Sequence, residues 1–247
     1  MASRRAVIAA AVVAFLTGIL IGSDPVNAPR LLIEFGGIVV STFVGAWAAF
    51  RLQTQTEEAK TRAGNAGALR RAQFALVEQF NVLETLRRGH LGPLRADPNR
   101  DLLLGPLAFF YEIPSIDLSS LAFLLESSPN RLQTLLMCQN LWNSVIGLLR
   151  QQSREFRRYQ ARMDEAVRAG LMAPREPPQK IRDLVGPEIT GALRTLTDGL
   201  YEKLDQALEA NETSFNNLAQ QMTLQFPGER PLKREVDRVV TRTPVDT

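Results

Sequence analysis

Residues Asn130 to Gly170 read NRLQTLLMCQNLWNSVIGLLRQQSREFRRYQARMDEAVRAG, and this stretch carries the clearest structural pattern in the sequence. Mostly apolar side chains recur in it at spacings that alternate between three and four residues, which is the heptad seam of a helix that packs against other helices. The seam positions are Leu135, Cys138, Trp142, Val145, Leu149, Gln152, Phe156, Tyr159, Met163 and Ala166. We therefore predict a long core helix that has Asn130 as its N-cap and ends at Gly170.

A second long helix is predicted from about Pro187 to Phe226, where Pro227 and Gly228 end it. Its seam repeats every eleven residues, a period that suits a straight or slightly right-handed helix. The three rows are Ile189, Leu200, Asn211 and Met222; Leu193, Leu204, Phe215 and Phe226; and Leu196, Ala207 and Leu218. Residues 227–247 contain few large apolar side chains, and we predict that they form a mobile tail.

A third long helix is predicted from Arg51 to about Gly89 or Gly92, because no proline interrupts this stretch and its apolar residues follow helical spacing. Gly64 and Gly67 each weaken a helix by about 1 kcal/mol relative to alanine, so a bend is expected there. Prolines punctuate residues 93–129, which indicates a connection with short helical pieces. One piece is predicted from Leu118 to Glu126, with Asp117 as its N-cap.

Three helices of similar length joined by two reversals predict an all-α fold, an elongated antiparallel three-helix bundle over residues 51–226. The connection over residues 93–129 is predicted to be a cap of short helices on one end of the bundle. An exposed surface that binds a partner is the alternative interpretation of this connection.

Two apolar runs precede the bundle, at about residues 6–22 and 31–50, and Glu34 is the only charged residue within them. Their lengths approach or match the roughly 30 Å hydrocarbon core of a bilayer. Residues 1–50 are therefore predicted to form a transmembrane helical hairpin. A cleaved signal peptide is the alternative for the first run, which follows Arg4 and Arg5, although it is longer than a usual signal sequence and a second run follows at once.

Small residues recur at every fourth position of both runs and therefore share one face of each helix. Such faces let helix backbones approach closely in lipid, so we predict that the two runs pack against each other, with homo-oligomerisation through the same faces as the alternative. The predicted packing residues are Ala10, Ala14, Gly18, Gly37, Ser41 and Gly45. Glu34 is predicted to pair at the interface with Arg30, and a functional intramembrane carboxylate is the alternative.

Basic residues precede the first run and follow the second, whereas the turn between the two runs holds Arg30 as its only basic residue. This distribution predicts a multi-pass protein of a cell inner membrane with both termini in the cytoplasm. In an antiparallel bundle the second helix would return toward the membrane. The arginines predicted to lie at the lipid surface are Arg154, Arg157, Arg158 and Arg162. A solvated helix face with local ion pairs is the alternative.

No catalytic, cofactor-binding or metal-binding constellation is evident in the sequence. His90 is the only histidine and Cys138 the only cysteine, and the sequence has no glycine-rich phosphate loop and no set of Cys and His at ligand spacing. The 29 basic residues nearly balance the 26 acidic ones, which argues against nucleic acid as a partner. We therefore predict a protein that is not an enzyme and binds no cofactor or metal.

Two segments, GAWAAFRLQ at Gly45 to Gln53 and FPGERPLK at Phe226 to Lys233, carry a resemblance to a known group. In these stretches the sequence resembles uncharacterised bacterial inner-membrane proteins with two N-terminal transmembrane helices and a cytoplasmic helical domain. The resemblance implies a bacterial cytoplasmic membrane, and it implies no activity and no site residues.

Together these patterns predict a membrane-anchored, non-enzymatic helical scaffold or interaction protein at the cytoplasmic face of the inner membrane. Its expected partners are the lipid bilayer and either another protein or further copies of the same chain. An oligomeric channel or membrane-perturbing effector is the alternative, although the two runs have almost no polar stripe to line a pore.

Overall fold

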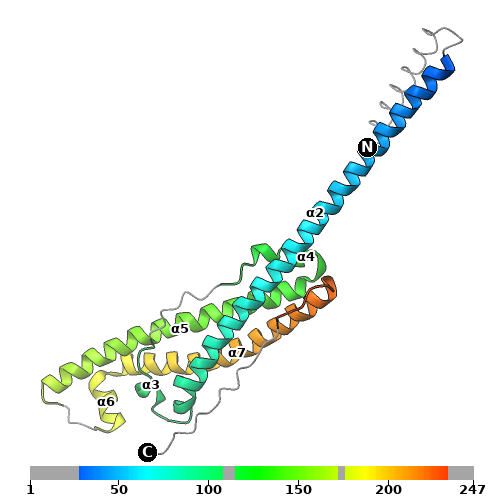
Figure 1. The fold of residues 1–247 in the computed structure, drawn as a ribbon. Helices are drawn as coiled ribbons and strands as arrows, with labels where there is room; N and C mark the ends of the chain where they lie inside the picture. The colour runs from blue at the N-terminus through cyan, green and yellow to red at the C-terminus, as the bar shows by residue number, and fades with distance from the viewer. Residues whose placement is uncertain (1–27, 108–114, 172–175, 233–247) are drawn as a thin grey trace, which may run out of the picture. The chain divides into compact units, whose positions relative to one another are not determined.

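The computed structural model describes residues 28–107, 115–171 and 176–232, with side chains from Gly36 onward. Within these ranges the chain is helical and has no strand, which confirms the all-α prediction (Figure 1). The long helices are α2 (Ala28–Leu86), α5 (Pro129–Arg168) and α7 (Pro187–Gln225). The short helices are a π-helix (Arg87–Leu91), 3-10 helices (Gly92–Leu94 and Ser119–Leu121), α3 (Arg100–Leu103), α4 (Leu124–Ser127) and α6 (Pro178–Val185).

The chain divides into two compact units, Met1–Thr61 and Arg62–Thr247. The described residues of the first unit, 28–61, all belong to α2. Helix α2 continues through Gly64 and Gly67, and the bend expected at these glycines stays a prediction. The backbone hydrogen bonds of the helix are kept because glycine lacks only a side chain, and its cost relative to alanine is modest.

The heptad seam of α5 is confirmed. Nine of its ten predicted positions are buried, and Met163, the exception, is half-buried. The predicted N-cap is wrong by two residues, because Ser128 occupies the N-cap position and Pro129 the first helical position. Proline suits that position since it has no N–H group to leave unpaired and its fixed φ matches the helix.

The eleven-residue rows of α7 are confirmed as well, since every predicted row position except Leu196 is buried. Gly186 precedes the helix with a φ of 98°, a conformation that favours glycine, and Pro187 follows it at the first helical position. Leu196 is half-buried because it lines a groove between α5 and α7.

Three clusters of buried apolar residues fill the second unit, and they give the directions of its helices. The first cluster contains Leu69 of α2, Leu135 of α5 and Phe215 of α7. The second contains Leu83 of α2, Val145 of α5 and Leu204 of α7. The third contains Phe156 of α5 and Leu193 of α7, and no residue of α2. From the first cluster to the second, residue numbers rise in α2 and α5 and fall in α7, and α5 and α7 continue in the same directions to the third cluster. Helix α5 therefore runs parallel to the bundle part of α2, and α7 runs antiparallel to both, so the predicted up-down-up arrangement is wrong.

The connection between α2 and α5 explains this topology. Gln152, far along α5, donates its amide N–H to the carbonyl oxygen of Leu104 at 2.7 Å. Gln139, near the start of α5, accepts from the backbone N–H of Ile116 at 3.1 Å. At 1.5 Å per residue these two contacts lie about 20 Å apart along α5. The connection therefore returns along the bundle, and the prediction that it caps one end is wrong.

Asp117 forms hydrogen bonds at the start of the 3-10 turn Ser119–Leu121, but the N-cap residue of that turn is Leu118, so the predicted N-cap is wrong by one residue. Its carboxylate accepts hydrogen bonds from the backbone N–H groups of Ser119 and Ser120, at 3.1 and 3.3 Å, and from the Ser119 hydroxyl at 2.6 Å. These hydrogen bonds, led by that of the Ser119 side chain, lower the pKa of Asp117 because they stabilise the ionised form. The predicted single helix is instead a 3-10 turn and one turn of α-helix.

The predicted location in a membrane is wrong for the part of the chain that the structure describes. None of the helices found there combines the length and the apolar character needed to cross a bilayer. The second predicted span, residues 31–50, lies inside α2, which continues without a break into the bundle. The first predicted span, residues 6–22, and the predicted tail beyond Leu232 lie outside the described residues.

The packing of α7 predicts a difference between two leucines on this helix. Leu200→Ala removes a fully buried side chain and should lower the free energy of unfolding by about 2–5 kcal/mol. Leu196→Ala makes the same change at a half-buried position and should cost clearly less. Urea unfolding of the full chain, followed by circular dichroism, measures both. Equal losses would contradict the assignment of Leu200 to the core.

Candidate functional site

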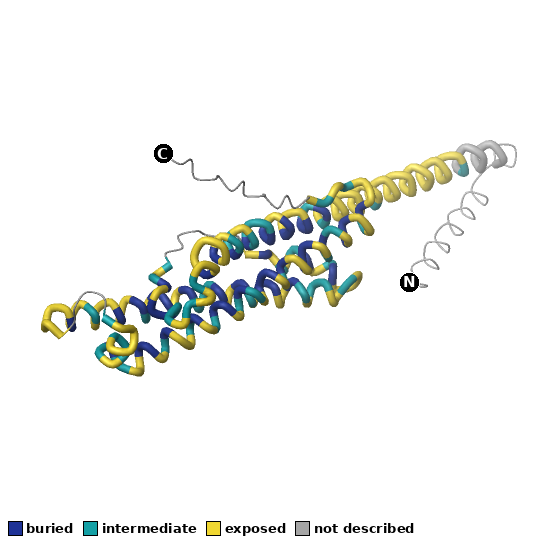
Figure 2. The backbone as a smooth tube through the Cα atoms, turned by 90° about the horizontal axis from the view of Figure 1, so that it is seen from below, coloured by how far each residue is buried: buried dark blue, intermediate teal, exposed yellow. Residues whose placement is uncertain are grey.

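One candidate site is a run of exposed apolar side chains on α2 in the first unit, which we call the α2 apolar surface. Phe43 is 71% exposed and Phe50 69% exposed, values that are unusual for phenylalanine. Figure 2 shows a long stretch of the α2 backbone in the colour of exposed residues. The members of this surface are Ile38, Val39, Val40, Phe43, Val44, Trp47, Phe50 and Leu52. The guanidinium of Arg51 lies 5.1 Å from the centre of the Trp47 ring, at the C-terminal part of the surface.

The predicted packing residues of this segment lie beside these side chains. Gly37 and Gly45 are exposed, and no described atom lies within 4 Å of where a Cβ at either position would be. The Ser41 hydroxyl donates to the carbonyl oxygen of Ile38 at 2.9 Å, within the same helix. Ala10, Ala14 and Gly18 lie outside the described residues, as does the side chain of Glu34. The packing of the two apolar runs therefore stays a prediction.

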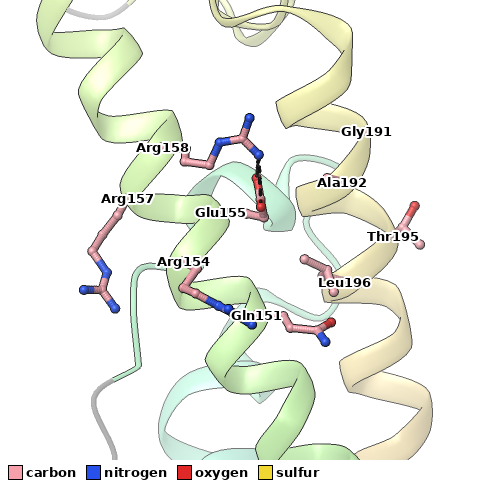
Figure 3. Close-up of a pocket in the computed structure, with 9 residues that line it drawn as sticks. All are labelled: Gln151, Arg154, Glu155, Arg157, Arg158, Gly191, Ala192, Thr195 and Leu196. Atoms are coloured by element: carbon pink, nitrogen blue, oxygen red, sulfur yellow. Dashed lines mark hydrogen bonds and ion pairs between the residues drawn. The ribbon is translucent and has the colours of Figure 1, made fainter.

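The second candidate site is a groove of about 900 Å³ between α5 and α7, which we call the α5–α7 groove (Figure 3). Both helices contribute long stretches to the bundle core, and the groove lies between them. Small and apolar residues of α7 line one side, and polar and charged residues of α5 line the other. The lining residues are Gln151, Arg154, Glu155, Arg157, Arg158, Gly191, Ala192, Thr195 and Leu196.

The charges of the α5–α7 groove are mostly positive. Arg158 donates to both carboxylate oxygens of Glu155, at 3.1 and 2.9 Å, and lies 3.6 Å from Glu188. These contacts, led by the hydrogen bond to Glu155, raise the pKa of Arg158, so its side chain stays charged. Arg157 donates to the backbone carbonyl of Ser153 at 3.3 Å and forms no ion pair within the described part of the chain. Arg154 has no carboxylate partner among the described residues, so two arginines keep their charge uncompensated by a local ion pair.

Three of the four arginines predicted to face lipid thus line the groove. Arg162 lies outside it and pairs with Glu165 at 3.0 Å. Within the second unit these arginines lie toward the third core cluster, whereas α2 contributes to the first and second clusters. The C-terminal end of α5 therefore lies at the opposite end of the bundle from the first core cluster. The prediction that Arg154, Arg157, Arg158 and Arg162 lie at a lipid surface assumed that α5 is antiparallel to α2. This assumption is wrong, because α5 runs parallel to the bundle part of α2.

An ion pair that the sequence did not predict anchors α6 beneath this end of the bundle. Arg182 donates to both carboxylate oxygens of the buried Asp101, at 2.7 and 2.9 Å. Nearby, Tyr201 donates to the carbonyl oxygen of Leu91 at 2.7 Å, and the guanidinium of Arg100 lies 4.8 Å from the Tyr201 ring centre. These contacts hold the connection and α6 to the long helices. They serve the fold, since each polar group is already bonded within the protein.

The described residues contain no cluster of side chains that could hold a metal ion. No group of three or more His, Cys, Asp and Glu side chains converges there. His90 lies in the π-helix at the end of α2. Cys138 is buried on the α5 seam, and burial raises the pKa of its thiol to about 11, which suppresses the nucleophilic thiolate. Comparisons with protein families, curated proteins and solved structures find no match to this chain.

The burial of Cys138 predicts low thiol reactivity. At about pH 8 the folded chain should react with a maleimide roughly a hundredfold or more slowly than the urea-unfolded chain, because the folded thiol has a raised pKa and little access to solvent. Mass spectrometry over time measures both rates. Rapid labelling of the folded chain would contradict the placement of Cys138 in the core.

Proposed function

We propose that this protein is a non-enzymatic helical scaffold that assembles with a second copy of itself through the α2 apolar surface. The observation that carries the proposal is the set of eight large apolar side chains exposed between Ile38 and Leu52. Soluble monomers rarely expose contiguous apolar surfaces of more than about a few hundred Å². Burying one such side chain contributes about 1.5–3 kcal/mol, so a surface of this kind favours association strongly.

The spacing within the α2 apolar surface supports a helix as its partner. Val40, Phe43, Trp47 and Phe50 are separated by three, four and three residues, which is the seam of a coiled coil. A second copy presents an identical seam, and a two-fold axis lets the same surface serve both chains. Polar residues follow directly, with Arg51 and Gln53 at the end of the seam, so the apolar contact has a defined limit.

The predicted helical hairpin of residues 6–22 and 31–50 fits the same proposal. Successive residues of a helix are rotated by about 100°, so Gly37, Ser41 and Gly45 lie on a different face of α2 from Phe43 and Trp47. The small-residue face is then left for residues 6–22, and the seam of large side chains for the second copy. The three-helix bundle is left free to bind other proteins.

The proposal is tested with the double variant Phe43→Ser and Trp47→Ser in the full chain. The parent should sediment as a dimer or larger species at micromolar concentration, and the double variant should shift to the monomer because it loses the centre of the seam. Sedimentation velocity gives the masses, and circular dichroism checks that the helices persist. Phe74→Ser is the matched control, since Phe74 is exposed on α2 but lies in the bundle unit, and it should leave the assembly unchanged.

A monomeric parent would contradict the self-association. So would a double variant that keeps the mass of the parent, because the α2 apolar surface would then not be the interface.

A further inference from the structure

We infer that the α5–α7 groove is a docking surface for an acidic amphipathic helix of a partner protein. The inference rests on the proposed scaffold role and names the chemistry of the partner, but it concerns the bundle unit and does not involve the α2 apolar surface. Its first support is shape. Two long antiparallel helices leave a lengthwise groove of about 900 Å³, which is the geometry that a further helix fills.

The floor of the groove lets a helix approach closely. Gly191 and Ala192 carry the smallest side chains, and a Cβ added at Gly191 would meet no described atom within 4 Å. The half-buried Leu196 adds apolar surface at one end. The lining residues of α5 extend from Gln151 to Arg158, about 10 Å along the helix, so roughly two turns of a docked helix lie within the groove.

The charges select the sign of the partner. Figure 3 shows Arg154 and Arg158 directed toward α7, whereas Arg157 points away from it along the outer flank. The carboxylates that face these side chains, Glu155 and Glu188, both lie against Arg158, which leaves Arg154 to meet an incoming group. Guanidinium groups bind carboxylates through paired hydrogen bonds, so glutamate and aspartate on the flank of a docked helix complement this rim.

The lining residues also separate an acidic helix from a nucleic acid. No aromatic side chain lines the groove, so bases would find no platform on which to stack. A helix with small and apolar residues on one face and carboxylates beside that face meets both halves of the groove. The apolar face lies on Gly191, Ala192 and Leu196, and the carboxylates lie along α5.

The test uses the full chain and a fluorescent peptide of about 18 residues, roughly five helical turns, with alanine and leucine on one face and glutamate on both flanks. A second peptide has lysine in place of every glutamate. Fluorescence anisotropy should show binding of the glutamate peptide, weaker binding at higher salt because screening reduces the attraction, and no binding of the lysine peptide.

Two variants remove the charge and the shape of the groove separately. Arg154→Glu with Arg158→Glu should weaken peptide binding at least tenfold by reversing the rim. Gly191→Leu should do the same by filling the floor without a change in charge, and the open space at Gly191 lets the helix keep its fold. Arg162→Glu with Arg168→Glu is the matched control, with the same change in charge on the same helix outside the groove, and it should bind as the parent does.

Several results would overturn the inference. They are no binding of the glutamate peptide by the parent, equal binding of the lysine peptide, an equal loss in the matched control, full binding by Gly191→Leu, or binding of a single-stranded RNA of similar length that the glutamate peptide does not displace. Repeating the assay with Phe43→Ser and Trp47→Ser separates the two proposals. Peptide binding that survives in this variant supports the groove whatever the state of assembly.

Discussion

The packing of α5 against α7 is the contact on which the rest of the fold depends. Each helix buries a continuous stripe over most of its length, and all three core clusters contain residues from both. The bundle part of α2 adds a third side to only two of these clusters, and α3 and α6 complete the remaining one. The connection before α5 and the short helices take their positions from the surfaces that this pair provides.

Local periodicity was enough to predict the long helices, because the burial of a residue on a packed helix follows its angular position. The seam of α5 and the rows of α7 were accordingly correct nearly residue by residue. The direction of packing was not predicted correctly, because the same apolar stripes are buried whether the first two helices run antiparallel or parallel. The decisive contacts, such as Gln152 to Leu104 and Ile116 to Gln139, come from a proline-rich connection whose path no repeat predicts.

The sequence likewise predicted some residues of the candidate sites and missed others. The arginines of the groove were singled out from the sequence, but their neighbours Gly191 and Ala192 lie on another helix and had no signal of their own. The pair of Asp101 and Arg182 joins residues 81 positions apart and was not predicted either. The second apolar run lies within a helix that continues into the bundle. Interpreting this run as a membrane span placed the arginines of α5 near lipid, and none of the described helices is apolar enough to be such a span.

The parallel arrangement of α2 and α5 bears on how the chain acquires its structure during synthesis. Gln79 of α2 bonds to Gln139, 60 residues later, and the carbonyl oxygen of Leu76 accepts from Asn211, 135 residues later. Helix α2 is translated before α5 and α7, which provide the surfaces that cover it. Helices α5 and α7 are closer to each other in sequence than α2 is to α7, so their contact closes a shorter loop than the contact of α2 with α7. During synthesis the apolar face of the bundle part of α2 therefore has no partner surface until α5 and α7 have been made.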